Sequence, residues 1–303
     1  MRHNLLVLSA GRKVVLVRAL ARHFEVVCSD LDPGSSSACQ CRRSLRQPAT
    51  DDPGFGGWLT EACASGKLDA VLPTRNQDML VLDAHRKNVG FADLVLSPLD
   101  TLKVCLDKVA LATFFASIDG VNVPSTVTTE SFWEVGMEYP VIAKDRYGAG
   151  SKRVWVVRNK DEARVFWSAA IVQPYIKGRE YTADCFFGWD GRLVQTVVRK
   201  RDRIVDGQMD VGQVIGSSSK AVEKIAGALK FCGPVNMQFI VDKNKEAWLI
   251  DINPRFSGGI GLTIAAGADY ALHLRKLVTG EEIDPLPVKM GVKAYGYREY
   301  IYG

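Results

Sequence analysis

Two polar side chains near the C-terminal end of the chain have the types and spacing of a metal site. Residues 249–259 read Leu-Ile-Asp-Ile-Asn-Pro-Arg-Phe-Ser-Gly-Gly, and their apolar start predicts a strand. Side chains alternate along a strand, so Asp251 and Asn253 are expected on one face, with Ile250 and Ile252 in the core. A carboxylate beside an amide oxygen suits Mg²⁺, an ion that bridges nucleotide phosphates.

Two further residues extend this site. Arg255 follows Pro254, which ends the strand, and is placed to meet an anion beside the metal. Gln238 lies between apolar residues on the preceding expected strand, at the separation of a hairpin partner for Asp251. Each residue alone also fits a turn, a strand-end cap or an edge position. Together they favour a metal–phosphate site.

A lysine followed by a glycine-bearing loop is the second candidate. Residues 141–144 are expected to form a strand that delivers Lys144, and a second strand is expected over residues 154–157. The loop between them contains Gly148, Gly150 and Ser151, and glycines let backbone N–H groups approach phosphates closely. The spacing is neither that of a P-loop nor that of a dinucleotide-binding motif. An ordinary hairpin turn is the alternative.

Two weaker signals concern the base, the ribose and the second substrate. Residues 171–176 are apolar and lead to Glu180, a pattern that suits an adenine linker with a ribose ligand but equally a core strand and turn. Alternation places Arg199, Arg201 and Arg203 on one face, either to grip a substrate carboxylate or as a solvated basic hairpin. Gly258 either lets a substrate approach the backbone or belongs to a plain loop.

The first hundred residues, which precede these motifs, alternate strands with single helices. This order predicts a parallel, doubly wound α/β domain that holds ligands at the carboxyl ends of its strands. Residues 34–57, rich in Ser, Pro, Gly and Arg, predict a surface loop. The expected strands are residues 5–8, 25–29, 70–73 and 94–96, and the expected helices are residues 13–23, 58–65 and 79–85.

The pattern changes after about residue 99, where the strands come as hairpins with turn signals at residues 189–191 and 242–245. Antiparallel strands with flanking helices predict an α+β domain. Its expected strands are residues 141–144, 154–157, 171–173, 181–187, 193–198, 237–241 and 247–252, and its expected helices are residues 101–117, 161–169, 219–231 and 263–278.

Composition excludes several classes of protein. The 303 residues are 47% hydrophobic and 24% charged, which is typical of a globular chain of roughly two domains. No apolar run reaches the roughly 20 residues of a membrane span, and no signal-peptide cleavage site is visible. The cysteines and histidines lack the spacing of a zinc site, so free thiols in a reducing cytosol are expected. A net charge of +5 fits a protein that handles anions, without the basic runs of nucleic-acid binding.

Together and in this order, the motifs resemble the ATP-grasp superfamily, specifically the group similar to half of the carbamoyl-phosphate synthetase large subunit. The resemblance covers nearly the whole chain and is most specific in residues 251–259. It implies a Rossmann-like pre-ATP-grasp domain over residues 1–100 and an ATP-grasp domain over residues 101–303, with a mobile lid at about residues 113–176. Further matching segments are Ser97-Pro98, Asp107-Lys108, Val123-Pro124 and Asn236-Met237-Gln238-Phe239.

The resemblance also implies a role for each matching residue. The two lysines contact ATP, the glycine loop covers the phosphates, residues 173–176 form the adenine hinge and Glu180 binds ribose. The implied ATP contacts are Lys108, Lys144, Gly148, Gly150, Ser151, Gln173, Pro174, Tyr175, Ile176 and Glu180. Mg²⁺, as one or two ions and with Mn²⁺ as a substitute, would be held by Gln238, Asp251 and Asn253, and Arg255 would steady the transferred phosphoryl group.

Three positions depart from the family pattern. The family usually has Glu where this chain has Asp251, and one methylene less leaves open whether one metal ion or two are bound. It often has Glu at the position of Gln173. Its glycine loop differs after Ser151, where this chain continues with Lys152 and Arg153.

The implied activity is ATP-dependent ligation of a carboxylate to an amine through an acyl-phosphate, with an amino acid as one substrate. A kinase or carboxylase that diverts the phosphorylated intermediate and a nucleotide-binding protein without turnover are the alternatives. An NAD-dependent oxidoreductase is disfavoured because only Gly11 occupies the first strand–helix turn. The implied setting is cytoplasmic, with small-molecule carboxylate and amine partners, no nucleic acid, no membrane and a homodimer by family habit.

Overall fold

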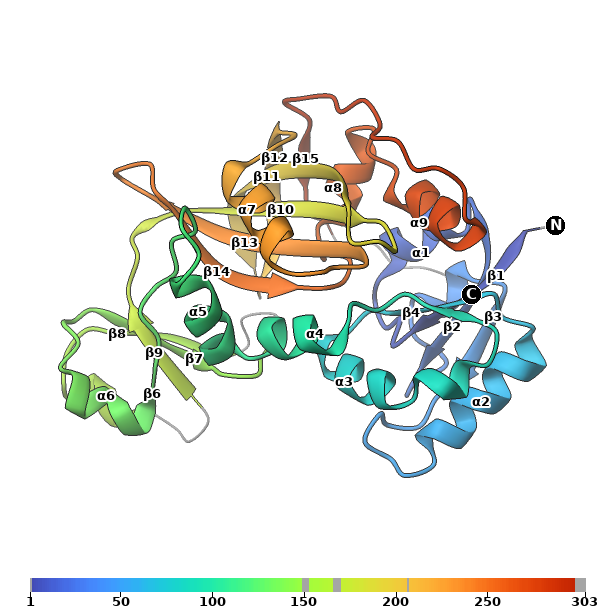
Figure 1. Cartoon of the computed structure of the whole chain (residues 1–303), viewed down its shortest axis with the longest axis horizontal. Coiled ribbons are helices and arrows are strands. Elements are labelled where there is room, and N and C mark those ends of the chain that lie inside the picture. The colour runs from blue at the N-terminus through green and yellow to red at the C-terminus, as the bar shows by residue number, and fades with distance from the viewer. Residues whose placement is uncertain (1, 149–152, 166–169, 206, 298–303) are drawn as a thin grey trace.

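A computed structural model describes residues 2–148, 153–165, 170–205 and 207–297 of the chain. The described residues form three sheets: a five-stranded N-terminal sheet, a six-stranded central sheet and a four-stranded small sheet. In Figure 1 the central sheet lies between the N-terminal sheet on one side and the small sheet on the other. The expected combination of an α/β domain with an α+β region is therefore confirmed.

The N-terminal sheet is parallel, with the strand order β3-β2-β1-β4-β5. Alternation along β1 sends Leu5 and Val7 toward α1, and Leu6 and Leu8 toward α2 and α3. Both faces are thus covered by helices, as expected. The elements are β1 (His3–Leu8), α1 (Val14–Leu20), β2 (Phe24–Asp30), β3 (Arg43–Arg46), α2 (Phe55–Gly66), β4 (Ala70–Pro73), α3 (Asn76–Ala84) and β5 (Asp93–Leu94), with 3₁₀ turns at Ala38–Gln40 and Arg86–Val89.

The prediction of a surface loop over residues 34–57 is wrong. This segment contains β3, an edge strand, and α2 already begins at Phe55, which is fully buried. The sequence Arg-Ser-Leu-Arg of β3 carries too little apolar alternation to reveal a strand, because an edge strand needs only one buried side chain to dock.

The central sheet is antiparallel, with the order β14-β13-β10-β11-β12-β15. The expected pairing of Gln238 with Asp251 across β13 and β14 is present. Strands β12 and β15 were not expected from the sequence. The strands are β10 (Gly178–Phe187), β11 (Leu193–Val205), β12 (Gln208–Gly216), β13 (Gly233–Asp242), β14 (Ala247–Asn253) and β15 (Lys293–Tyr295).

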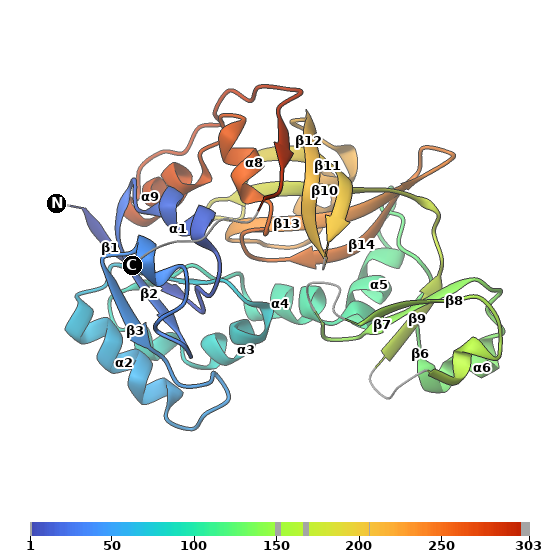
Figure 2. The ribbon, with the colours of Figure 1, turned by 180° about the vertical axis from the view of Figure 1, so that it is seen from behind.

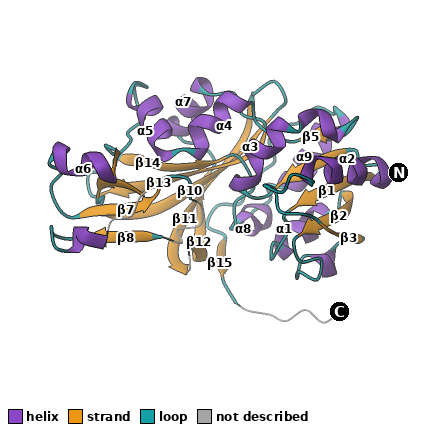
Figure 3. Ribbon diagram, turned by 90° about the horizontal axis from the view of Figure 1, so that it is seen from below, coloured by secondary structure: helices purple, strands orange, loops and turns teal. Residues whose placement is uncertain are grey.

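Two long expected helices are each broken in two. The helix expected over residues 101–117 splits at Asp107, whose side chain accepts hydrogen bonds from the backbone N–H groups of Val109 and Ala110 and so caps a new helix. The helix expected over residues 263–278 splits around Gly267, whose φ of +108° no helix allows. The helices are α4 (Leu99–Leu106), α5 (Lys108–Ala116), α7 (Lys220–Ala228), α8 (Ile260–Ala265) and α9 (Tyr270–Thr279). Seen from below, α4, α5 and α7 lie along one face of the central sheet (Figure 3).

The small sheet has the order β6-β9-β7-β8 and lies beyond α5, as the view from behind shows (Figure 2). Of the helix expected over residues 161–169, the structure describes a 3₁₀ turn at Glu162–Val165, and residues 166–169 lie outside the described residues. The elements are β6 (Val127–Thr128), α6 (Thr129–Val135), β7 (Val141–Asp145), β8 (Val154–Val157) and β9 (Ala170–Pro174).

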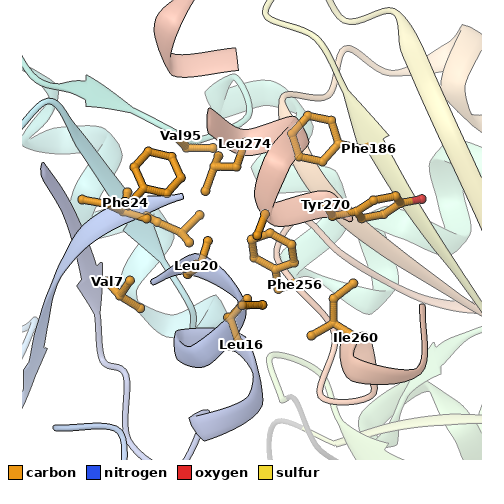
Figure 4. Packing of buried hydrophobic residues seen from close by; sticks show 14 of the residues in the cluster. Val7, Leu16, Leu20, Phe24, Val95, Phe186, Phe256, Ile260, Tyr270 and Leu274 are labelled. Atoms are coloured by element: carbon orange, nitrogen blue, oxygen red, sulfur yellow. The ribbon is translucent and has the colours of Figure 1, made fainter. Parts of the chain in front are cut away.

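One apolar core joins the N-terminal sheet to the central sheet. Leu20 and Phe24 from the first region pack in the same cluster as Phe256 and Tyr270 from the second (Figure 4). Because such cores are close-packed, this joint fixes how the two sheets sit against each other. In the parts of the chain that the structure describes, every helix is too short or too polar to cross a bilayer.

Candidate active site

A cavity of about 210 Å³ lies where the small sheet faces the central sheet. It gathers most of the residues that the sequence singled out for ATP and metal binding. Gly150 and Ser151 lie outside the described residues. The predicted residues that line the cavity are Lys108, Lys144, Gly148, Gln173, Pro174, Tyr175, Ile176, Glu180, Gln238 and Asp251.

The two lysines of this cavity are bound to backbone carbonyls. Lys108, 7% exposed, donates from Nζ to the oxygen of Gly148 at 2.7 Å, and Lys144 donates to the oxygen of Ile250 at 3.3 Å. Among the described residues neither lysine has a carboxylate within ion-pair distance. Burial lowers the pKa of Lys144 to about 8, opposed by the nearby charge of Asp251. Both cations are therefore placed to receive an anion.

The start of the glycine loop is tied to the body of the protein. Arg146, two residues before Gly148, makes a bidentate ion pair with Asp107, with donor–acceptor distances of 2.8 and 2.6 Å. Asp107 is also the cap of α5, so a single carboxylate fixes both the first residues of that helix and the loop above Lys108.

Part of the cavity wall is apolar, as a nucleotide base requires. Ile142 shares a strand face with Lys144, and Ile240 shares a face with Gln238, so simple alternation accounts for both. Ile250 lines the same cavity, and the expectation that it points into the core is wrong. The register of β13 and β14 shifts between Gln238 and Phe239, which leaves Ile250 as an extra residue on the cavity side.

The predicted adenine hinge is held in place from within. The side chain of Gln173 is buried and donates from Nε2 to the Thr126 hydroxyl at 2.7 Å. The backbone N–H of Tyr175 donates to the oxygen of Pro140 at 3.1 Å. Gln173 thus shapes the hinge, while Pro174 and Tyr175 are exposed at its surface.

Glu180, the predicted ribose ligand, is already engaged. One of its carboxylate oxygens accepts from Arg201 at 2.7 Å, and Arg201 also donates to the backbone oxygen of Gly207. Burial lowers the pKa of Arg201, and the charge of Glu180 opposes that shift. Glu180 therefore lines the cavity while it is held in this ion pair.

The predicted metal ligands fall into two groups. Gln238 and Asp251 pair across β13 and β14 and both line the large cavity, and within the described chain Asp251 has no cationic partner at ion-pair distance. An amide oxygen and an unpaired carboxylate beside two lysines fit Mg²⁺ bound together with phosphate. Asn253 instead points its Nδ2 at Asp251, at 2.9 Å, and its Oδ1 already accepts two hydrogen bonds.

Arg255 is fixed by three acceptors. It donates to Asn76 Oδ1 at 2.7 Å, to the backbone oxygen of Phe256 at 2.9 Å and to Asn253 Oδ1 at 3.1 Å. Burial lowers its pKa, opposed by the charge of Asp251. The sequence analysis did not identify Asn76, although its place three residues after β4, near a carboxyl end of the N-terminal sheet, was a usable signal.

A second cavity, of about 50 Å³, adjoins the first and shares Gln238 and Gly207 with it. The predicted residues that line it are Arg199, Arg201, Gln238, Asn253, Arg255 and Gly258. It has room for one small polar group and not for a nucleotide.

The expectation that Arg199 grips a substrate conflicts with its surroundings. Arg199 is 1% exposed and forms a bidentate pair with Asp184 at 2.6 and 3.0 Å, with a further bond to the Ser257 hydroxyl at 3.0 Å. The three arginines also do not follow one regular alternation, because the pairing register between β11 and β12 shifts between Arg201 and Arg203. Arg203 pairs with Asp210 at the surface. The arginines of β11 are therefore bound to carboxylates of the protein itself.

Two sequence families match this chain. Residues 167–297 match an ATP-grasp family described as acting in the biosynthetic pathway with the Ter operon. Residues 5–94 match the PylC-like N-terminal domain.

Solved structures with the same fold extend over nearly the whole chain. N5-carboxyaminoimidazole synthetase from Staphylococcus aureus, complexed with ADP, matches with a TM-score of 0.75 at 16% identity, over 95% of this chain and 81% of that chain. L-amino acid ligase from Bacillus licheniformis matches with a TM-score of 0.71 at 16% identity, over 94% and 78%. The biotin carboxylase domain of 2-oxoglutarate carboxylase from Hydrogenobacter thermophilus matches with a TM-score of 0.74 at 12% identity, over 97% and 74%.

At such identities these structures show the fold alone, and the two family matches concern two separate segments of the chain. The match to the ATP-grasp family spans the central sheet from β10 onward, including the strands that carry Gln238 and Asp251. The chain therefore joins a PylC-like N-terminal domain to an ATP-grasp domain.

Proposed function

We propose that the protein is an ATP-dependent ligase that phosphorylates a carboxylate and joins the resulting acyl group to an amine, with an amino acid as one substrate. The observation that carries this proposal is the meeting of the two cavities at Gln238. The larger cavity has several apolar wall residues and two lysines without a carboxylate partner among the described residues, and the smaller one is lined by Asn236 and Arg255. A triphosphate in the first would direct its terminal phosphoryl group toward an anion in the second.

The residues on each side have distinct tasks in this reaction. Phosphoryl transfer depends on positioning and charge neutralisation, which Lys108 and Lys144 supply to the phosphates. Mg²⁺ bound with ATP would screen the phosphate charge, and Gln238 and Asp251 are placed to hold it. Arg255 lies on the side of the acceptor, where its charge offsets the one that develops on the transferred group.

The smaller cavity offers a hydrogen-bond donor for the carboxylate. Asn236 is 2% exposed, and its Nδ2 has no hydrogen-bond partner among the described residues. A buried donor of this kind costs free energy until a ligand satisfies it. Asn236 and Arg255 together suit the two oxygens of a carboxylate, and this is the proposed seat of the acyl substrate.

The comparisons favour ligation over the alternatives. The proteins with this fold include one named as an L-amino acid ligase and one named as a synthetase, and the matched ATP-grasp family is placed in a biosynthetic pathway. A kinase that stops at the phosphorylated carboxylate would use the same two cavities. That kinase is the second candidate.

Hydroxylamine trapping tests the proposal. The protein is incubated with Mg²⁺, ATP, hydroxylamine and each of a panel of amino acids, and hydroxamate and phosphate are both measured. We expect hydroxamate with at least one amino acid, and replacement of hydroxylamine by an amine substrate should give an amide. Asp251→Asn, which removes the unpaired carboxylate, is the control that should abolish both products.

The other outcomes separate the alternatives. ADP together with a stable phosphorylated product, without amide formation from any amine, identifies a kinase. If the protein binds nucleotide but forms no ADP with any amino acid or with any other class of carboxylate, an enzymatic role is contradicted.

A further inference from the structure

Asn76 connects the N-terminal sheet to the proposed reaction centre. It is the first residue of α3, three residues after the last residue of β4, yet its carboxamide contacts Asn253, the last residue of β14, and Arg255, two residues beyond it. Its Oδ1 accepts from Arg255 Nε at 2.7 Å, and its Nδ2 donates to Asn253 Oδ1 at 2.7 Å. Both polar atoms of one short side chain thus bind residues at or just after the end of a strand of the central sheet.

These contacts continue toward the larger cavity. Arg255 also donates to Asn253 Oδ1, at 3.1 Å, so Asn76, Arg255 and Asn253 form a closed ring of hydrogen bonds. With its oxygen held by two donors, Asn253 turns its Nδ2 to Asp251 at 2.9 Å. The orientation of the Asn253 amide therefore follows from Asn76.

The chemistry of the ring requires an amide at position 76. Arg255 is donor-only, so its partner must accept, while Asn253 Oδ1 is an acceptor, so its partner must donate. Asparagine does both from one planar group. Aspartate would still accept from Arg255 but would set a carboxylate oxygen against Asn253 Oδ1.

The scaffold on both sides of the ring is rigid. β4 is buried along its length, and the core shared by Leu20, Phe24, Phe256 and Tyr270 fixes the N-terminal sheet against the central sheet. Asn76 is therefore held from behind by packing that does not depend on the ring itself. It can restrain Arg255 more tightly than a residue on a free loop could.

We propose that Asn76 is a positioning residue, through which the N-terminal sheet holds Arg255 and Asn253 in the orientation that phosphoryl transfer needs. This inference rests on the proposed function of the site. Asn76 lines neither the larger nor the smaller cavity. Its role is to aim Arg255, and misplacement of a catalytic group by about 1 Å can cost about 100-fold in rate.

The test compares Asn76→Ala with Gln77→Ala, the exposed neighbour on the same helix. The rate of hydroxamate formation at saturating amino acid, the KM for ATP and the dissociation constant of Mg²⁺–ADP are measured for both. We expect Asn76→Ala to lower the rate about 10- to 100-fold and to leave both nucleotide constants within about twofold, since no contact in the nucleotide cavity is lost. Gln77→Ala should match the wild-type protein.

Two further variants separate positioning from folding. Asn76→Asp keeps the shape of the side chain, so it should fold as the wild type does and still lose rate at least as much as Asn76→Ala. In an Arg255→Ala background, Asn76→Ala should lower the rate by a clearly smaller factor than in the wild-type protein, because one of the two residues that it positions is gone.

Each failure has its own signature. Wild-type rates in Asn76→Ala and Asn76→Asp, or a full additional loss in the Arg255→Ala background, overturn the positioning role alone. Absence of hydroxamate from the wild-type protein with every substrate overturns the proposed function, and the role of Asn76 falls with it.

Discussion

The cations of the nucleotide cavity and those of strand β11 differ in their partners. Lys108 and Lys144 are bound to backbone carbonyls, and no carboxylate of the described residues pairs with them. Arg199, Arg201 and Arg203 instead pair with Asp184, Glu180 and Asp210. The partner of a cation, and not its sequence pattern, decides whether it is available for a ligand.

The presence or absence of a carboxylate partner also changes the free-energy cost of burying each cation. Burial of Lys144 without a carboxylate lowers its pKa to about 8, a cost that bound phosphates would remove. At Arg199 the ion pair with Asp184 and the hydrogen bond to Ser257 offset the cost of burying the charge. A Cβ on Gly259 would lie 2.5 Å from Arg199 Nη1, so this arginine also packs against the backbone of the loop after Arg255. Arg199 serves to hold that loop.

The largest expected effect therefore comes from Arg199→Met. Removing the cation leaves the carboxylate of Asp184 buried and uncompensated, which costs about 3–5 kcal/mol of the free energy of unfolding. Urea denaturation measures the loss. Arg203→Met is the matched control, since its pair with Asp210 is exposed and should contribute less than about 1 kcal/mol.

The opposite result would reverse the comparison. An Arg199→Met protein that is as stable as the wild type but binds its carboxylate substrate poorly would show that Arg199 grips a substrate, as the alternation of the sequence suggested.

The sequence predicted the site best where regular alternation along a strand shows which side chains share a face. Gln238 and Asp251 could be paired because both lie on apolar strands joined by a short turn, and Ile142 and Ile240 could have been found by the same alternation. The ATP-grasp resemblance extended these local patterns to nearly the whole chain.

What the sequence could not supply depends on contacts between distant segments. Three such contacts are the bulge that turns Ile250 into the cavity, the ion pair of Arg199 with Asp184 and the hydrogen bond from Arg255 to Asn76. Each depends on residues whose pairing cannot be predicted from helix or strand periodicity. The charged Asp184 in the buried second half of β10, beside Ala183, Cys185 and Phe186, was a local sign that a buried partner must exist.

Lys144→Met is expected to have the second-largest effect, and on binding instead of stability. Loss of a desolvated charge next to the phosphates should weaken ATP binding roughly 10- to 100-fold, or about 1.4–2.8 kcal/mol. Stability should be unchanged or higher, because the cost of burying the ammonium disappears. Calorimetric titration with ATP and Mg²⁺ measures the affinity, with Lys177→Met, an exposed lysine near the hinge, as the control. A less stable variant with normal affinity would place Lys144 among the structural cations.

The smallest effect is the dependence of nucleotide binding on pH. Lys144 in the free protein has a pKa of about 8, and the phosphates of bound ATP favour its charged form, so its pKa in the complex is higher. Binding therefore takes up a proton, and affinity falls as pH rises above about 8, by at most about tenfold per pH unit. Titrations at pH 7.5 and 9 in buffers of different ionisation enthalpy measure both the affinity and the proton uptake.

Lys144→Arg keeps its charge over this range, so it should bind ATP with little change between the two pH values. If the arginine variant retained the full pH dependence, a group other than Lys144 would be the one that titrates, and the contrast between unpaired and paired cations would lose its thermodynamic support.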